Sequence, residues 1–193
     1  MFFSDQGTKS APPQKLYAVF AREQTDDEAE IAPKVAADSP CAFAGSENRE
    51  LAAGGKPIPE QARILLRGLR GQGSLVAVPT TDDNVSLAVF PNGGGTCARP
   101  TDDGLILAAD VQEDTATVYG MVDDKVRSVD VVAGGQTHRA KLAENGFTVA
   151  LQSGEEMHLD KLVLHKADGS KTDIPLGQTC RNRSTGSRST RPA

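Results

Sequence analysis

Between residues 105 and 176 the sequence alternates short, valine-rich segments with pairs of turn-forming residues, and this pattern constrains the fold more than any other feature. Asp123-Asp124, Gly134-Gly135, Asn145-Gly146 and Asp168-Gly169 are pairs that accept the positive φ angles of tight β-hairpins. The segments between these turns have the composition of β-strands: residues 105–110, 115–122, 126–133, 136–142, 146–152, 160–166 and 170–176. About seven short strands at roughly ten-residue spacing predict a small antiparallel sandwich, meander or barrel.

The segment 146–152 indicates how these strands are oriented. Successive side chains of a strand point to opposite faces. Phe147, Val149 and Leu151 therefore form the predicted inward set, and the residues between them face outward.

The first hundred residues carry more varied signals. Residues 15–22 have a β-favouring composition without Gly or Pro, which predicts a buried strand. Thr25 and Glu28 have the spacing of a capping box and Pro33 interrupts the segment after them, so we expect a short helix over about 26–32. The small and polar residues 38–57 predict a loop.

A second helix is predicted over about 59–70. Pro59 suits a first helical turn, apolar residues recur at helical spacing, and Gly71 follows as a stop signal. The opposite face of this helix would carry a basic stripe formed by Arg63, Arg67 and Arg70. Such a stripe could bind a phosphate or a carboxylate-rich partner, and a solvated helix face has the same pattern.

Residues 74–80 and 85–90 follow as two strands joined through a turn. The expected fold is therefore mainly β, and α+β overall. N-terminal strands with two short helices precede a C-terminal antiparallel β-sandwich or meander.

The same signals divide the chain into four parts. We expect an N-terminal α+β region over 15–110 and a sandwich-like region over 111–176. Residues 1–14 and 177–193 lack a pattern of large apolar side chains, so both ends are predicted to be disordered.

The net charge of −5 hides an acidic body, because four arginines lie in residues 177–193 and leave the rest of the chain near −9. An acidic body argues against a nucleic-acid partner, since phosphate contacts need clustered Lys and Arg. The basic tail could contact an anionic surface, although such tails are usually only solvated. No stretch approaches the roughly 20 apolar residues of a membrane span.

Sequence motifs of known chemistry are missing or out of order. Residues 68–73 are glycine-rich, but they follow a predicted helix and precede a strand, the reverse of a dinucleotide-binding loop. His138, His158 and His165 fall on different strands or opposite faces of one strand, which disfavours a shared metal. No Gly-x-Ser-x-Gly motif is present. We therefore expect no catalytic, cofactor or metal site.

Three cysteines allow at most one internal disulfide. Cys97 lies beside the core strands and is the expected participant. Its partner is either Cys41 in the predicted loop or Cys180 just past the last predicted strand, and the sequence does not choose between them.

Several stretches are familiar in combination: LYAVFAREQT, ARILLRGLRG, SLVAVPT followed by GGGTC, VYGMVDDKVRSVDV, LAENGFTVAL and KLVLHKADGS. Over about residues 15–176 they resemble a group of uncharacterised actinobacterial proteins with a C-terminal β-sandwich-like region. Members of that group are mostly exported or membrane-tethered, so the resemblance implies an extracytoplasmic location. The N-terminus has neither the basic start nor the apolar core of a signal peptide, and a cytoplasmic location stays open.

The expected function is that of a non-catalytic extracytoplasmic module that binds an unknown protein or cell-envelope polymer, or lends structure. One alternative is a hydrolase whose groups assemble from loops, with His158, His165 and Cys97 as candidates. The other is an extracellular regulatory domain of a membrane-anchored sensor. The sequence leaves the ligand and the oligomeric state open.

Overall fold

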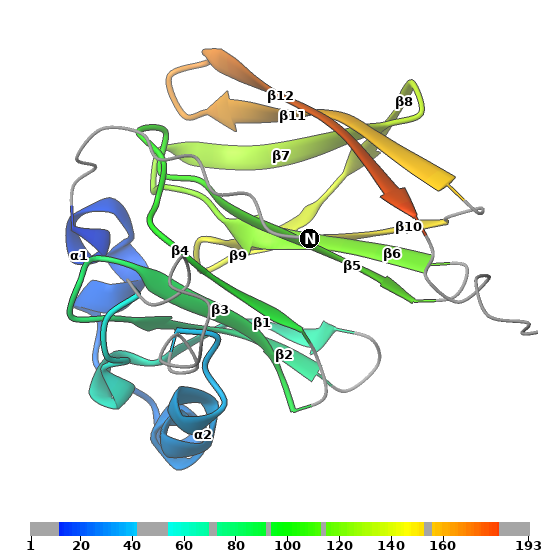
Figure 1. Cartoon of the computed structure of the whole chain (residues 1–193). Helices are drawn as coiled ribbons and strands as arrows, with labels where there is room; N and C mark the ends of the chain where they lie inside the picture. Colours follow the sequence, from blue (N-terminus) through cyan, green and yellow to red (C-terminus); the bar gives the residue numbers. More distant parts are fainter. Residues whose placement is uncertain are drawn as a thin grey trace, which may run out of the picture.

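A computed structural model describes residues 12–41, 54–69, 73–91, 94–112, 115–152 and 156–181. Over these residues the chain is mainly β, with two short α-helices and antiparallel sheets, so the predicted fold class is confirmed (Figure 1). Three four-stranded sheets are stacked in layers, and helix α2 (Asp26–Ala37) covers the free side of the first sheet.

The first sheet is a meander in the order β1-β2-β3-β4. Its strands are β1 (Arg63–Leu69), β2 (Gly73–Pro79), β3 (Val85–Phe90) and β4 (Gly95–Ala98). One face packs Val76 and Val78 against Ala32 and Val35 of α2. The other face contributes to the core shared with the middle sheet.

The middle sheet has the order β5-β6-β10-β9. Its strands are β5 (Ile106–Gln112), β6 (Thr115–Met121), β10 (Gly146–Gln152) and β9 (Lys141–Ala143). Successive residues of β5 enter two different cores: Ile106 packs toward the first sheet and Leu107 toward the outer sheet. A strand buried on both faces needs apolar residues at every position, which explains the continuous apolar run that begins at Leu105.

The outer sheet has the order β12-β11-β7-β8 and forms a sandwich with the middle sheet. Its strands are β12 (Lys171–Arg181), β11 (Glu156–Lys166), β7 (Val126–Ala133) and β8 (Gln136–Arg139). Val129, Leu162 and Leu164 of this sheet meet Phe147 and Leu151 of β10 in the shared core. Phe147 and Leu151 are buried and Val149 is half-buried against the same core, which agrees with the inward set predicted for this strand.

Residues 15–22 are not a strand. They form the end of α1 (Pro13–Leu16) and the short 3-10 helix η1 (Ala18–Ala21). The burial prediction was right, since Tyr17, Val19 and Phe20 all lie in the core. The backbone prediction failed because the amides of Ala18 and Val19 donate to the side chains of Asp124 and Asn145, and not to a neighbouring strand.

The predicted helix over 59–70 is also wrong. A single 3-10 turn, η3 (Pro59–Gln61), precedes β1, which pairs antiparallel with β2. The pairing shifts register between Ile64 and Leu66 and again between Arg67 and Leu69. Irregularities of this kind place neighbouring residues on the same side of a strand. Buried leucines then recur at a spacing that resembles a helical repeat.

Other elements end at different residues from those predicted, because tertiary contacts override local sequence signals. Helix α2 begins with the predicted capping box, but it continues through Pro33 to Ala37, since its buried residues extend to Val35. The predicted strand over 136–142 divides at Ala140, where the chain passes from the outer sheet to the middle sheet.

The predicted division of the chain also differs from the observed strands. The boundary at 110/111 falls inside β5, which pairs entirely with β6 of the middle sheet. The predicted disordered tail begins inside β12, and residues 182–193 of that tail lie outside the described residues. Residues 12–14 of the predicted disordered N-terminus are described, and Pro13 and Gln14 belong to α1.

Candidate functional site

Cys41 and Cys97 are joined by a disulfide, with their Cα atoms 5.1 Å apart. Cys41 follows the C-terminal end of α2, and Cys97 lies in β4. Of the two partners considered for Cys97, the structure selects Cys41. Cys180 lies in β12, and its side chain is outside the described part of the chain.

The disulfide lies in a buried polar junction between α2 and the first sheet. The Ser39 hydroxyl lies 2.7 Å from the Ser86 hydroxyl, and Ser86 is directly opposite Cys97 in the β3–β4 ladder. The amide of Cys41 donates to Ser39 Oγ at 3.1 Å. The disulfide therefore fastens the helix layer to an edge strand, and Cys97 is not a thiolate nucleophile while the bond is intact.

A second buried polar cluster is centred on Glu28 of α2, which is 1% exposed. Its carboxylate accepts hydrogen bonds from the Arg22 guanidinium at 2.6 and 2.7 Å and from the backbone amides of Thr25 and Ile64. Burial acts to raise the pKa of this carboxyl, but these donors outweigh it and lower the pKa to about 2. Glu28 is thus held as an anion that ties α2 to the segment before it and to β1.

The predicted arginine stripe does not form. Arg63 is buried, and its guanidinium donates to the carbonyl oxygens of Val19, Arg22, Glu60 and Ala62. Arg67 is exposed and forms an ion pair with Asp27 at 2.8 Å. Arg70 lies outside the described residues. Burial lowers the pKa of Arg63, and its hydrogen bonds connect η1 and η3 to the first sheet and do not face solvent.

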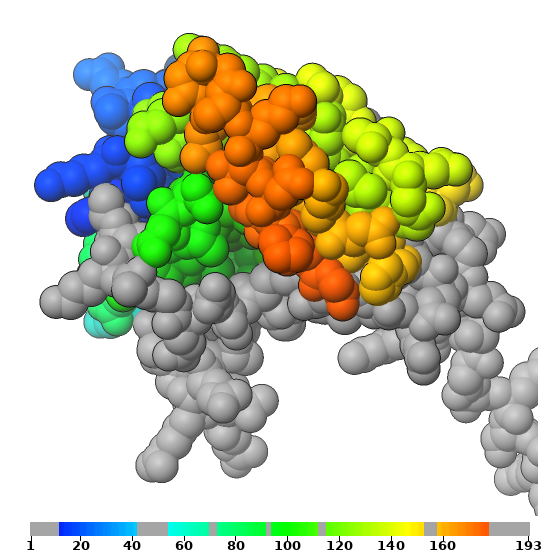
Figure 2. All heavy atoms as spheres, turned by 90° about the horizontal axis from the view of Figure 1, so that it is seen from above, coloured from blue at the N-terminus to red at the C-terminus, as the bar shows by residue number. Residues whose placement is uncertain are grey.

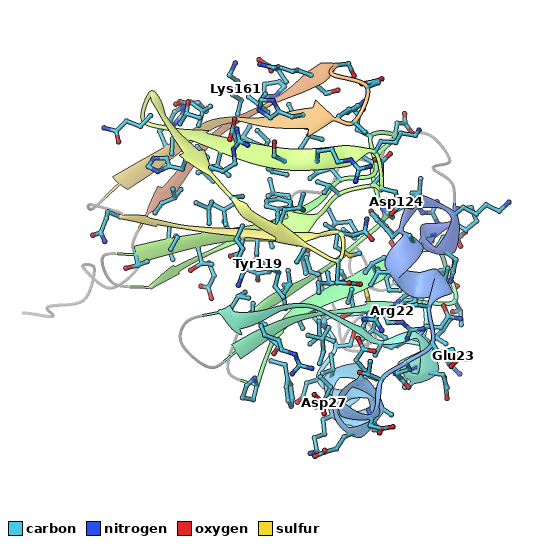
Figure 3. The ribbon with its side chains drawn as sticks, turned by 180° about the vertical axis from the view of Figure 1, so that it is seen from behind. Arg22, Glu23, Asp27, Tyr119, Asp124 and Lys161 are labelled. Atoms are coloured by element: carbon cyan, nitrogen blue, oxygen red, sulfur yellow. A yellow bond between two sulfur atoms is a disulfide. The ribbon has the colours of Figure 1, made fainter. Side chains whose placement is uncertain are left out.

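The outward face of the outer sheet carries a network of charged side chains. Asp130 of β7 accepts hydrogen bonds from Arg139 of β8, and its Oδ2 lies 2.7 Å from Nε2 of His165 in β11. Burial acts to raise the pKa of Asp130, but the hydrogen bonds from Arg139 and His165 prevail and lower it. Lys161 forms an ion pair with Asp173 on the same sheet, and Figure 3 shows Lys161 on the outward side.

The histidines do not converge on one site. His158 Nε2 lies 3.5 Å from Asp160 Oδ1, whereas His165 is paired with Asp130, and His138 lies in β8. Within the described ranges, no group of three or more His, Cys, Asp or Glu side chains is placed to hold a metal ion.

A recess of about 250 Å³ lies between the loop over 99–105 and strand β12. Figure 2 shows the green atoms of this loop beside the orange atoms of β12. Its lining has an apolar part, Pro100, Leu105 and Ile174, and a charged part, Arg99, Asp102 and Asp103. Pro100 and Leu105 are buried, while Arg99 and Asp102 are exposed, so the apolar part lies deeper.

The two outermost layers differ in charge. Helix α2 contains four acidic residues and one lysine, whereas the strands of the outer sheet contain six Lys and Arg residues against four Asp and Glu residues. The acidic character inferred for the whole body is therefore concentrated away from the outer sheet.

Comparisons with family models, curated proteins and solved structures gave no match to this chain. Among the residues that the structure describes, no helix is both long and apolar enough to span a membrane.

Sequence reasoning missed most of these groups. The sequence predicts only the capping-box role of Glu28. Its second role, accepting a hydrogen bond from the amide of Ile64, depends on β1, which the sequence predicts as a helix. Asp130 and His165 lie in segments that were correctly predicted as strands, but no spacing signal indicated which strands are neighbours. The recess between the 99–105 loop and β12 had no signal in the sequence.

Proposed function

We propose that this protein is an extracytoplasmic, non-catalytic module that binds another macromolecule of the cell envelope. The disulfide between Cys41 and Cys97 is the observation that carries this proposal. Structural disulfides persist in oxidising compartments and are rare in the cytosol. The bond lies just past the C-terminal end of α2, where Cys41 is 3% exposed, so it has the position of a structural crosslink.

The binding role is supported by the outward face of the outer sheet. Arg139, Asp130 and His165 form one hydrogen-bonded group there, and Lys161 and Asp173 form another. Charged groups that are held in place by a rigid sheet provide a specific electrostatic pattern for a partner. The actinobacterial resemblance adds support for the location, because members of that group are mostly exported or tethered.

The compartment can be tested by counting thiols in protein isolated from its native source. Rapid acid quenching followed by alkylation should label one cysteine before reduction and three after it, and peptide mapping should recover a Cys41–Cys97 link. Three labelled cysteines without reduction would contradict the proposal. A Cys180→Ser variant expressed in the same host is the matched control, because it removes the remaining thiol and leaves the proposed pair intact.

The hydrolase alternative keeps His158 and His165 as candidates, since Cys97 is bonded to Cys41. His165 is held by a buried carboxylate, which is an arrangement that can orient a general base, and His158 lies 3.5 Å from Asp160. A broad hydrolase screen with His158→Ala and His165→Ala tests this alternative, and His138→Ala serves as the control. Activity that disappears in the His158 or the His165 variant but not in the control would favour the hydrolase. The sensor-domain alternative shares the proposed compartment and requires the same thiol count.

A further inference from the structure

We infer that Asn145 is a deamidation site whose reaction is gated by the N-terminal segment over residues 16–20. While this segment is packed, it helps to hold the side-chain amide of Asn145 in place. Once the segment is displaced, that amide can react with the backbone nitrogen of Gly146. The product is a carboxylate beside Asp124, which weakens the packing of the segment, so the modification acts as a one-way release.

Both residues of the Asn145-Gly146 pair are required by the fold. Asn145 has a φ of 66°, in the left-handed region that asparagine tolerates better than most residues. Gly146 begins β10 against β1, and a Cβ at this position would stand 2.5 Å from the Cβ of Leu65. A glycine also leaves the nitrogen after asparagine unhindered for attack on the asparagine side chain. Packing at this turn therefore retains a chemically labile pair.

Hydrogen bonds hold both ends of the Asn145 amide. Its Nδ2 donates to Asp124 Oδ1 at 2.8 Å and to the carbonyl oxygen of Val122 at 3.1 Å. Its Oδ1 accepts from the backbone amide of Val19 at 3.3 Å. Cyclisation requires the Asn145 Cγ to turn toward the Gly146 nitrogen, and this rotation breaks these bonds. The packed structure thus opposes the reaction.

The N-terminal segment is held by the same two side chains. The amide of Ala18 donates to the carboxylate oxygens of Asp124 at 2.8 and 3.0 Å, next to the bond from Val19 to Asn145. Figure 3 shows Asp124 beside this helical part of the chain. Tyr17 holds the segment from the core side, because it is fully buried and its hydroxyl donates to the carbonyl of Gly104 at 3.1 Å. Displacement of the segment therefore removes one bond from Asn145 and one partner from Asp124.

The reaction needs water as its only co-reactant. The Gly146 nitrogen forms a bond to the Asn145 Cγ, the Cγ–Nδ2 bond breaks, and Nδ2 leaves as ammonia with the proton from the Gly146 nitrogen. Water then opens the resulting succinimide ring at one of its carbonyl carbons. Opening at the side-chain carbonyl gives aspartate, and opening at the backbone carbonyl gives isoaspartate.

Deamidation replaces attraction by repulsion at this site. A carboxylate at position 145 lacks the amide hydrogens that bond Asp124 and the Val122 carbonyl, and it places a second negative charge beside Asp124. Like charges that share a site repel, and a buried acceptor that loses its donor destabilises the structure. Asp124 then no longer has the fixed position in which it receives the amide of Ala18.

The gate is tested by incubating the full chain in mildly alkaline buffer and following conversion at position 145 by peptide mapping with mass spectrometry. The urea-unfolded chain supplies the ungated rate. We expect the folded wild type to react at least about tenfold more slowly, because a local opening must come first. Tyr17→Ala should raise the folded rate about tenfold, since it loosens the segment and leaves the side-chain partners of Asn145 in place.

The matched control is Val131→Ala, which leaves a cavity in the sandwich core and away from the core that the segment joins. This variant should keep the wild-type rate. Tyr17→Phe, which removes only the hydroxyl bond to Gly104, should give a smaller rise and replaces the alanine variant if that variant does not fold. Equal rates in folded and unfolded wild type, equal acceleration by Val131→Ala, or no acceleration in a folded Tyr17 variant would overturn the gate.

The release is tested by hydrogen exchange at the amides of Ala18 and Val19. Asn145→Asp, which mimics the aspartate product, should accelerate their exchange about tenfold. Adding Asp124→Asn to this variant returns an amide donor to the pair and should recover most of the protection, whereas a merely structural loss at position 145 would not be recovered. Wild-type exchange in the aspartate variant, or no recovery in the double variant, would overturn the release. Neither measurement depends on the compartment or on a partner, so failure here is distinguishable from failure of the thiol count.

Discussion

The layer formed by α2 and the first sheet is stabilised differently from the sandwich formed by the middle and outer sheets. The first layer contains a disulfide and two buried polar clusters, centred on Glu28 and on Ser39. The sandwich core is almost entirely aliphatic, with one aromatic ring at Phe147. A single helix on a sheet buries a small apolar area, so the first layer is also held by a disulfide and by buried hydrogen bonds. Two packed sheets bury enough apolar area to be stabilised by close-packed side chains alone.

The sandwich should be most sensitive to a loss of side-chain volume. Phe147 is fully buried, and its ring lies so close to Gly120 that a Cβ at that position would stand 2.6 Å from it. Phe147→Ala should lower the free energy of unfolding by about 4 kcal/mol, because it leaves a cavity between the sheets.

Urea denaturation measures this loss, and Phe147→Leu is the graded control, with an expected loss of about 1 kcal/mol. Should the alanine variant fail to fold, the leucine variant still reports on the site. A loss below 1 kcal/mol for the alanine variant would contradict close packing at the Phe147–Gly120 contact.

Removal of the disulfide should affect mainly the first layer. The crosslink closes a chain separation of 56 residues, and its loss should cost about 3 kcal/mol, the middle of the range for native disulfides. In a Cys41→Ser, Cys97→Ser variant, hydrogen exchange should accelerate in α2 and β4 and change little in β7 and β11. Equal acceleration in all of these elements would show that the layers do not differ, and Cys180→Ser provides the control with an intact crosslink.

Glu28→Gln should lower stability at neutral pH by about 2 to 3 kcal/mol, because hydrogen bonds to a charged group are lost. The pKa of Glu28 is about 2 in the folded protein against an ordinary value of 4.5. The stability that ionised Glu28 contributes is therefore fully present above about pH 4.5 and is lost as the pH falls toward 2.

Thermal unfolding between pH 2 and pH 7 measures this dependence. Wild-type protein should lose stability as the pH falls through this window, and the glutamine variant should lose less. Glu30→Gln is the matched control on the exposed side of α2, and it should keep the wild-type pH profile. Parallel profiles for the wild type and the Glu28 variant would contradict the role of the buried anion.

The same contrast explains which parts of the fold were predictable from sequence. Hairpins in the sandwich were predicted because local signals coincide: Gly134 and Gly135 both adopt positive φ between β7 and β8, and Phe147 starts a correct alternation. The turn before β10 lies one residue earlier than predicted, because Glu144 and Asn145 adopt positive φ and Gly146 begins the strand. The first layer was predicted poorly because distant side chains decide its backbone. Residues 15–22 avoid a strand by bonding to Asp124 and Asn145, more than a hundred positions away.

The candidate site was less predictable than the fold. Cys97 was identified, but its partner depended on where the chain after α2 passes β4, and the sequence does not specify that path. The stripe of Arg63 and Arg67 depended on a helix that does not exist. The recess is formed by the loop over 99–105 and by Ile174 of β12. These segments lie together because of how the sheets stack, and residue periodicity does not specify this stacking.

The smallest effect is expected on the outward face of the outer sheet. Lys161 and Asp173 are 41% and 53% exposed, so their ion pair is screened by solvent and should contribute no more than about 0.2 to 1 kcal/mol. A double-mutant cycle with Lys161→Ala and Asp173→Ala, followed by urea denaturation at low and high salt, measures this coupling. A coupling above 2 kcal/mol would mean that the outer face is stabilised by its charges, as the first layer is. A coupling within the expected range would mean that these charges are largely dispensable for folding, which leaves them available for contact with a partner.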